Sequence, residues 1–259
     1  MSDPLYAVPE IYELAFTFRD YHAAVDFLTA AAKSAGLTRI NSMVEYGCGP
    51  GQYCREFAQR GVSSYGIDLS PEMALYANKC ADAKELPCQI IEADMRTIRL
   101  EQPVDLACCM MATFGYLHKN DDIIMHLQTV AANLKHGGIY IVELPHPKGI
   151  FGGAKATHDQ WEMERDGIKL SIDWCGDCRF DPLTELDTGT VRMAWEKDGQ
   201  PHSHSAIDTT RRISRGLIEA LVQLSGHFEI VNMYGDLRLD QPFDNSKKSW
   251  RMVVVIRKK

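Results

Sequence analysis

The amino-acid sequence predicts an α/β protein in which a doubly wound, mostly parallel sheet of seven strands carries a small inserted antiparallel sheet. Three observations support this fold class. Strand-like apolar runs alternate with helix-like segments through residues 37–146. A glycine-rich turn follows the first strand, and short alternating segments replace the earlier pattern between residues 147 and 213. With 45% hydrophobic and 24% charged residues, the 259-residue chain can bury a substantial core.

The N-terminal region predicts a helix that begins after Asp20. Asp20 is a suitable N-cap for residues 21–35, and Gly36 ends the helix. Apolar residues recur at helical spacing, so one face of this helix is expected to pack on the core. Aromatic residues precede it, and they either cover a ligand as a lid or only pack the helix: Tyr6, Tyr12 and Phe16.

Residues 42–52 read S-M-V-E-Y-G-C-G-P-G-Q, and they predict the ligand-binding turn of the sheet. A short strand containing Glu45 is followed by glycines at alternate positions, Gly47, Gly49 and Gly51. Glycine takes positive φ without steric cost and lets a ligand approach the backbone closely. A helix over residues 52–60 follows at once and would present free N–H groups to the ligand. The spacing does not match the dinucleotide fingerprint G-x-G-x-x-G/A.

The second strand is expected over residues 62–67, and it ends at a carboxylate. Asp68 lies where an acidic side chain can accept two hydrogen bonds from a ribose diol. A turn-capping role for Asp68 is the alternative. Ser70, followed by Pro71 and an acidic residue, then predicts the start of a helix that runs to about Ala83.

Three further strands complete the parallel part of the sheet: residues 87–93, 104–111 and 139–143. The run at 104–111 is almost wholly apolar, which is typical of a strand covered on both faces. Asp94 follows the first of the three. Asn120 or Asp121 is expected to cap a helix that runs from about residue 122 to 134, before the strand at 139–143.

Residues 147–213 predict an inserted antiparallel sheet, because short alternating segments are separated by turn dipeptides such as Asp166-Gly167 and Asp198-Gly199. The alternating segments are residues 161–164, 170–174, 190–195 and 202–210. An amphipathic helix over 214–224 and two final strands then return to the main sheet. The final strands are residues 228–234 and 250–256.

The pattern Glu45-x-Gly47-x-Gly49-x-Gly51, with Asp68 and Asp94 at the following strand ends, resembles the class I S-adenosylmethionine-dependent methyltransferases. The resemblance covers about residues 40–146, including L-K-H-G-G-I-Y-I-V-E at the fifth strand. It implies a Rossmann-like methyltransferase fold, S-adenosyl-L-methionine as cofactor and S-adenosyl-L-homocysteine as product. The inserted sheet and the F-G-Y-L segment look most like those of sugar or amine N-methyltransferases.

The resemblance also implies which residues contact the cofactor. Glu45 and the three glycines would hold its methionine part, Asp68 its ribose, and Asp94 with Met95 its adenine. Without the resemblance, Asp94 is an ordinary loop aspartate. Met73, in the first turn of its helix, should lie near the cofactor. The remaining expected contacts are Tyr12, Arg19, Leu69 and Met111.

Methyl transfer is an in-line displacement that depends on alignment, and it needs a base only where the acceptor must lose a proton. Candidate bases follow the fourth and fifth strands: Tyr116, His118 and His146. A histidine can accept a proton near neutral pH. Of the two histidines His146 is preferred, with an ordinary loop histidine as the alternative for each. We expect no metal site.

Two groups in the inserted segment allow more than one interpretation. Its tryptophans either line an acceptor pocket or form the core of the small sheet: Trp161, Trp174 and Trp195. Cys175 and Cys178 form a C-x-x-C pair that could bind a metal or act in redox chemistry. There is no second such pair and no thioredoxin-like context, so we expect reduced structural cysteines.

We therefore expect three parts: an N-terminal helical lid (1–36), a cofactor-binding domain (37–146 with 214–259), and an inserted β subdomain that covers the acceptor site (147–213). The net charge of −7 argues against nucleic acid as a partner. No apolar run reaches membrane-spanning length, and residues 1–10 lack the features of a secretion signal. Eight cysteines without an export signal indicate a cytoplasmic protein.

The predicted function is transfer of a methyl group to a small-molecule acceptor, with N-methylation favoured over O-methylation. The alternatives are a non-catalytic partner subunit that binds S-adenosylmethionine, an RNA or protein methyltransferase, and a nucleotide-dependent oxidoreductase. The last would need a true G-x-G-x-x-G motif. The oligomeric state, a homodimer included, is left open.

Overall fold

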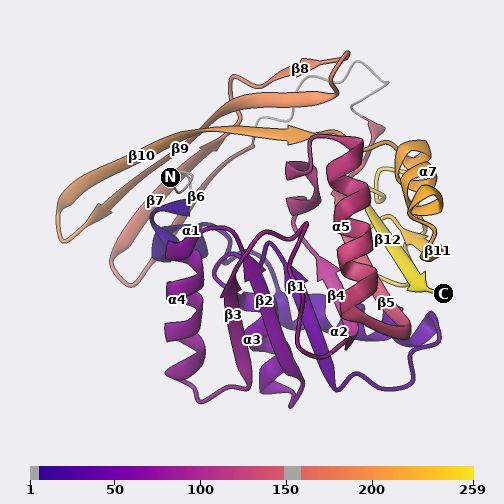
Figure 1. Cartoon of the computed structure of the whole chain (residues 1–259). Helices are drawn as coiled ribbons and strands as arrows, with labels where there is room; N and C mark the ends of the chain where they lie inside the picture. Colours follow the sequence, from indigo (N-terminus) through magenta and orange to yellow (C-terminus); the bar gives the residue numbers. More distant parts are fainter. Residues whose placement is uncertain (1–5, 149–158) are drawn as a thin grey trace.

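A computed structural model describes residues 6–148 and 159–259, and it contains two sheets (Figure 1). The larger has seven strands in the order β11-β12-β5-β4-β1-β2-β3. Strands β1 to β5 pair in parallel, whereas β12 is antiparallel to both of its neighbours. This confirms the predicted fold class. The strands are β1 (Ser42–Tyr46), β2 (Ser63–Asp68), β3 (Cys88–Glu92), β4 (Val104–Cys109), β5 (Leu134–Pro145), β11 (Phe228–Tyr234) and β12 (Arg251–Lys258).

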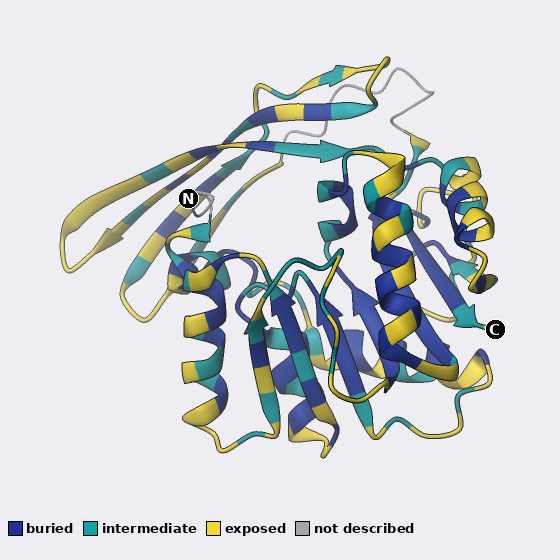
Figure 2. Cartoon of the chain, in the orientation of Figure 1, coloured by how far each residue is buried: buried dark blue, intermediate teal, exposed yellow. Residues whose placement is uncertain are grey.

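Helices cover both faces of the larger sheet. Side chains of α2 (Tyr21–Ser34) and α3 (Gln52–Gln59) share one core with alternate strand residues such as Met43. Side chains of α5 (Asn120–Asn133) and α7 (Arg215–Ser225) share the other core with the intervening residues such as Val44. The central strands are accordingly buried along their length (Figure 2). None of the helices in the described part of the chain is long and apolar enough to cross a membrane.

Side-chain caps fix the starts of three helices where the sequence predicts them. Asp20 accepts a hydrogen bond from Ala23 N, and Ser70 accepts one from Met73 N at the start of α4 (Pro71–Asp82). Ser214 caps α7 in the same way. The predicted cap of α5 is wrong, because that helix already begins at Asn120 without a side-chain cap. Acidic residues in its first turn still complement the positive end of the helix.

Strand β5 begins at Leu134, directly after α5, and is therefore longer than the predicted 139–143. Leu134 pairs with Val104, and the register then shifts before Ile139 pairs with Leu106. Gly137, at φ +72°, lies within this irregular stretch. A bulge of this kind inserts extra residues into a strand without ending the ladder of hydrogen bonds. In the sequence, the glycines at 137 and 138 look like a turn before the strand, so the residues before them were not predicted as part of β5.

The inserted sheet lies over the edge at which the parallel strands end (Figure 1). Its order is β10-β9-β7-β6, with β8 paired to β9. One face forms a third core with α1 (Pro9–Ala15), a short helix that precedes the predicted one. The inserted strands are β6 (Asp159–Arg165), β7 (Ile168–Trp174), β8 (Arg179–Asp181), β9 (Leu186–Lys197) and β10 (Gln200–Arg211).

The structure joins Cys175 and Cys178 in a disulfide, so the expectation of reduced cysteines at this pair is wrong. The turn after β7 holds their Cα atoms 4.9 Å apart, a separation at which the two sulfurs can bond. Gly189 lies against both sulfurs and leaves no room there for a side chain. The other six cysteines of the chain are free thiols. Residues 1–5 of the predicted lid and 149–158 of the predicted subdomain lie outside the described residues.

Candidate cofactor and acceptor site

The glycine loop lies between β1 and α3, and its conformation depends on glycine. Gly47, Gly49 and Gly51 all have positive φ, at +67°, +51° and +78°. The Gly47 and Cys48 amides both donate to Ile67 O, which fastens the loop to the end of β2. A Cβ on Gly47 would overlap the Thr113 side chain, so the loop after β4 can pack directly on it. Both backbone conformation and close approach therefore require glycine here.

Asp68, at the end of β2, is held between the glycine loop and α4. Its Oδ2 accepts from Gly49 N (2.6 Å) and its Oδ1 accepts from Ser70 N (2.9 Å). Burial raises the pKa of Asp68, while these backbone hydrogen bonds counteract the increase. The carboxylate keeps further lone pairs on both oxygens, and these can accept hydrogen bonds from a diol.

Glu45 is the buried carboxylate of the site. It is 3% exposed at the end of β1, and its Oε2 accepts from the Cys54 thiol (3.3 Å). Burial raises the pKa of Glu45 to about 8, because the ionised form loses its hydration. The group therefore favours a cationic ligand that could compensate its charge.

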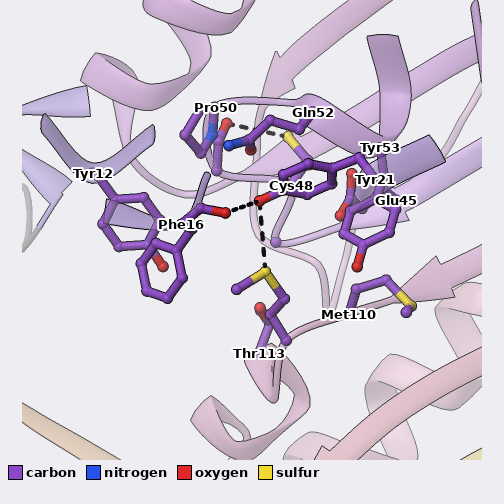
Figure 3. A pocket seen from close by; sticks show the side chains of 13 residues that line it. Tyr12, Phe16, Tyr21, Glu45, Cys48, Pro50, Gln52, Tyr53, Met110 and Thr113 are labelled. Carbon is purple, nitrogen blue, oxygen red and sulfur yellow. Dashed lines mark hydrogen bonds between the residues drawn. The ribbon is translucent and has the colours of Figure 1, made fainter. Parts of the chain in front are cut away.

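Aromatic side chains close a cavity over the glycine loop (Figure 3). Tyr12 and Phe16 come from the N-terminal region, and the rings of Tyr21 and Tyr53 meet edge to face with their centroids 5.0 Å apart. The Tyr21 hydroxyl lies 3.5 Å from Phe16 O and 4.0 Å from the Met111 sulfur. The cavity volume is about 30 Å³. This is room for about one water molecule, so a larger ligand requires the aromatic side chains to move.

Two of the buried donors in the described structure that have no hydrogen-bond partner are the Tyr53 hydroxyl, which belongs to a residue of the cavity lining, and Arg19 Nε, whose guanidinium charge acts on Tyr21 and Tyr53. Arg19 Nη2 pairs with Glu143 Oε1 (2.8 Å), and Arg251 pairs with the same oxygen. Glu143 Oε2 also accepts from Met111 N (3.1 Å). Unsatisfied buried donors cost free energy, and a ligand carboxylate would satisfy them.

The loop after β4 carries two consecutive residues in the left-handed region, Met111 at φ +51° and Ala112 at φ +64°. Such conformations are costly for residues with side chains and concentrate at functional sites. Glu143 fixes both residues, because its side chain binds Met111 N and its carbonyl accepts from Ala112 N (3.2 Å). Glu143 is absent from the residues singled out in the sequence, although its place at a strand end matches that of Glu45.

The predicted adenine contacts lie at the end of β3. Both carboxylate oxygens of Asp94 bind Arg96, which lowers the pKa of Asp94. Arg96 also pairs with Asp122 (2.8 Å). A ligand amino group that binds Asp94 would therefore share this carboxylate with Arg96. Met95 O accepts from His126 Nδ1. Of the two remaining contacts near α4, Leu69 is 71% exposed and Met73 is fully buried.

The structure separates the three candidate bases into two groups. Tyr116 donates to Asp208 Oδ1 (2.8 Å) and His118 Nε2 binds Thr209 O (2.8 Å), so both contact β10. His146 instead lies against the loop before β12, with Nε2 bound to Asp244 O (2.9 Å) and Nδ1 accepting from Lys148 N (3.1 Å). Its backbone partners thus occupy both ring nitrogens.

The tryptophans of the inserted sheet lie in two places. Trp161 donates to Ala15 O at the end of α1 (2.7 Å) and stacks with Trp174, with their ring centroids 6.4 Å apart. Trp195 stacks on His202 instead. The first two therefore attach the inserted sheet to α1, while a role in binding an acceptor stays a prediction. No group of three or more possible metal ligands occurs among residues 6–148 and 159–259.

Residues 43–138 match the family model of a methyltransferase domain. The chain contains a methyltransferase domain. The match spans the glycine loop, Asp68 and Asp94, so the predicted resemblance to methyltransferases is confirmed for this segment of the chain. The solved structure of an S-adenosylmethionine-dependent methyltransferase from Clostridium acetobutylicum has the same fold, with a TM-score of 0.77 at 16% identity and 92% of each chain covered.

A second solved structure, an S-adenosylmethionine-bound amino pentose methyltransferase from Micromonospora echinaspora, gives a TM-score of 0.73 at 17% identity. It covers 96% of this chain and 97% of that chain. At these identities the likeness establishes the fold of this chain alone. A cofactor of this kind also fits the residues present, because Arg19 and Tyr53 offer donors to a carboxylate beside Glu45, which favours an ammonium group.

Among curated relatives, a dTDP-3-amino-3,4,6-trideoxy-alpha-D-glucopyranose N,N-dimethyltransferase from Streptomyces venezuelae is 26% identical over 140 residues, which are 52% of this chain and 55% of that relative. A trans-aconitate 2-methyltransferase from Escherichia coli is 31% identical over 140 residues, 53% of this chain and 50% of that relative. The chain thus spans about half the length of the curated relatives that it matches.

Proposed function

We propose that this protein transfers the methyl group of S-adenosylmethionine to a small-molecule acceptor, with a nitrogen atom favoured over oxygen. The fit of the glycine-loop site to an amino-acid and ribose ligand carries the proposal. Glu45 can hold the ammonium group, Arg19 and Tyr53 the carboxylate, and Asp68 the ribose. The amino-sugar N,N-dimethyltransferases among the relatives support a nitrogen acceptor.

When bound, S-adenosylmethionine supplies a methyl group on a sulfonium that is displaced in line by the acceptor. The protein's own contribution is position and exclusion of water, which can lower the barrier by on the order of 7 kcal/mol or more. In this proposal the N-terminal region acts as the lid and the inserted sheet covers the acceptor. Met111, whose amide donates to Glu143, lines the cavity over the glycine loop.

A carboxylate acceptor is the second candidate, since one relative is a trans-aconitate 2-methyltransferase. An ionised carboxylate needs no base, whereas an ammonium group must lose a proton before it can attack. A non-catalytic partner subunit would bind the cofactor but methylate neither kind of compound. An RNA acceptor would call for a large positively charged surface, which a net charge of −7 does not favour.

The cofactor assignment is tested by calorimetric titration of S-adenosylhomocysteine into the wild-type protein and Asp68→Ala. Loss of a buried, charge-assisted contact should weaken binding at least tenfold, by roughly 1.5 kcal/mol or more. Asp82→Ala, at an exposed position of α4, is the matched control and should bind like wild type. Tight NAD binding, or no binding of S-adenosylhomocysteine by the folded protein, would refute the assignment.

The acceptor class is tested by methyl transfer to dTDP-3-amino-3,4,6-trideoxy-alpha-D-glucopyranose and to trans-aconitate in parallel. Methylation of the amino sugar alone supports the nitrogen acceptor. Methylation of trans-aconitate alone would replace it with the carboxylate acceptor. Transfer to neither, with intact cofactor binding, would count in favour of the partner subunit.

A further inference from the structure

The connection from β3 to β4 crosses the larger sheet without forming a helix. It spans residues 93–103, and β1 and β2 lie between the two strands that it joins. Parallel strands are usually joined through a helix, which satisfies its own backbone hydrogen bonds. An irregular connection must instead find partners for its amides and carbonyls among other elements. This connection also carries Asp94 and Met95, the predicted adenine contacts.

Helix α5 supplies these partners from one of its faces. Polar side chains recur along it at spacings of four, three and four residues, which places them in a line along the helix. The first is half-buried, and the other three are 0%, 2% and 1% exposed in chain order. We refer to these residues as the polar stripe of α5: Asp122, His126, Thr129 and Asn133.

The two middle residues of the polar stripe bind the backbone at the predicted adenine contacts. His126 Nδ1 donates to Met95 O (2.9 Å), and the Thr129 hydroxyl donates to Arg96 O. The ring of His126 is itself held, because its Nε2 accepts from the Tyr140 hydroxyl (2.7 Å). Two consecutive carbonyls of the connection thus bind buried side chains of α5, and this fixes the backbone at that point.

Asn133, the last residue of the polar stripe, binds the far end of the connection. Its Oδ1 accepts from Leu100 N (3.1 Å), and its Nδ2 donates to Ile98 O (3.1 Å). The same Nδ2 donates to the Tyr46 hydroxyl of β1 (2.9 Å). The amide side chain thereby takes the part of a neighbouring strand and satisfies backbone groups that a helix would have satisfied internally.

Asp122, the first residue of the polar stripe, orients the side chain of Asp94 through Arg96. Arg96 Nη1 binds Asp122 Oδ1 (2.8 Å), while its Nε and Nη2 bind Asp94 Oδ2 (3.0 and 2.6 Å). The direction of the remaining lone pairs of Asp94 is therefore set from α5. Ala93 N donates to Asp68 O (2.9 Å). Asp94 thus follows directly beyond the proposed ribose contact, where a base joined to that ribose would lie.

We propose that the polar stripe of α5 positions Asp94 and Met95 to recognise adenine, and so determines which nucleoside the cofactor site accepts. This inference rests on the proposed methyltransferase function. A carboxylate accepts a hydrogen bond from the 6-amino group of adenine, whereas the 6-oxo group of hypoxanthine presents only lone pairs at that place. A site built around a hydrogen bond rejects an analogue that lacks the donor. Members of the stripe act through Asp94 and Met95, so they are positioning residues.

The test compares S-adenosylhomocysteine with S-inosylhomocysteine, which carries hypoxanthine in place of adenine, by calorimetric titration. The wild type should bind the adenine compound at least about tenfold more tightly. Thr129→Val removes the hydroxyl but keeps the shape of the buried side chain. It should weaken binding of S-adenosylhomocysteine about tenfold and leave S-inosylhomocysteine unchanged, because only the adenine compound uses the positioned segment. Thr129→Ser retains a hydroxyl and should restore the preference.

Ser225→Ala is the matched control, because the buried Ser225 hydroxyl also donates to a backbone carbonyl, that of Val222 within α7 (2.7 Å). This variant loses a hydrogen bond of the same kind without touching the connection, so its preference for adenine should equal that of the wild type. Asp122→Asn changes a half-buried residue and leaves the core intact. It should reduce the preference about threefold, and it decides the question if Thr129→Val does not fold.

Equal weakening of both ligands in Thr129→Val, or an unchanged preference in it and in Asp122→Asn, would show that the polar stripe only holds the fold, and would overturn the proposal. Equal affinity of the wild type for the two ligands would overturn it as well. If the folded wild type does not bind S-adenosylhomocysteine at all, the proposed function is refuted, and the adenine site with it.

Discussion

Glu45 combines deep burial with an acidic side chain, and its protonation should change when the cofactor binds. With a pKa of about 8, the carboxyl group is mostly protonated at pH 7. A ligand ammonium group beside it would favour the carboxylate and release about one proton per site. Calorimetry of S-adenosylhomocysteine binding in buffers of different ionisation enthalpy measures this release directly.

The release should vanish in Glu45→Gln, which cannot ionise, and should fade in the wild type above pH 9, where Glu45 is already ionised. Binding that releases no proton at pH 7 in the wild type would show that the ammonium group is held elsewhere.

Residue types at strand ends could be predicted from the sequence because they follow a periodic signal. Glu45 and Asp68 each close an apolar run, and the structure places both at the glycine loop. Asp208 could not be found in this way. It lies in the middle of an alternating strand, where nothing in the local pattern distinguishes a buried carboxylate from a solvated one. Tyr116, which donates to Asp208, and Tyr6, which donates to Tyr116, are brought together with it by the tertiary fold.

At the scale of elements, α1 is fastened over the glycine loop through Glu13. One oxygen of Glu13 binds Arg55 of α3, and the other accepts from the Tyr76 hydroxyl of α4 (2.6 Å). Arg55 also binds Pro50 O in the glycine loop. Because the cavity beneath α1 holds only about one water molecule, the cofactor cannot enter until these contacts open.

Glu13→Ala should therefore loosen the lid without altering the loop beneath it. We expect faster association and faster dissociation of S-adenosylhomocysteine, with the dissociation rate raised about tenfold as one ion pair and one hydrogen bond are lost. Stopped-flow measurement of Trp and Tyr fluorescence would follow both rates. Glu10→Ala, on the exposed side of the same helix, is the control, and equal rates in the two variants would argue against a lid.

The helices and strands that were predicted best from the sequence are those with strong local signals. The caps at Asp20 and Ser70 form as expected, since a short polar side chain satisfies a free amide at a helix start. The start of β5 was missed because no turn separates it from α5 and the strand pairing with β4 decides the boundary. The cap of α5 was predicted wrongly because that helix begins at Asn120 without a side-chain cap, so no capping residue marks its start. The disulfide was missed because the C-x-x-C spacing alone does not determine the turn geometry that brings Cys175 and Cys178 together.

For the whole molecule, stability should depend on pH through His126, which is fully buried between α5 and the sheet. His126 Nδ1 donates to Met95 O and Nε2 accepts from the Tyr140 hydroxyl, so the neutral ring is the one that fits. Burial lowers its pKa from 6.5 to about 4. The unfolded chain thus binds a proton between these values and the folded chain does not.

This contribution to stability is complete above about pH 6.5 and is lost as the pH falls to about 4, by roughly 3 kcal/mol in total. Glu45 acts in the opposite direction, because its raised pKa gives stability below pH 4.5 that is lost as the pH rises to about 8. Urea unfolding across pH 4 to 9 tests both. His126→Asn should flatten the acidic limb and Glu45→Gln the alkaline one, and unchanged limbs in these variants would contradict the assignment.

The topology of the larger sheet could be predicted as a whole because regular alternation of strands and helices leaves few alternatives. The placement of the inserted sheet could not. The core that the inserted sheet shares with α1 combines apolar side chains that lie far apart in the sequence, such as Ile11 and Met193. Such contacts have no local signature.

Helix α1 touches both halves of the site, since Tyr12 faces the glycine loop and Ala15 O accepts from Trp161 of the inserted sheet. Opening it for one ligand therefore disturbs the binding of the other. The kinetics should follow a compulsory order, in which S-adenosylmethionine enters first and S-adenosylhomocysteine departs last. S-adenosylhomocysteine would then inhibit competitively against S-adenosylmethionine and noncompetitively against the acceptor. Its release would be the rate-limiting step of each turnover.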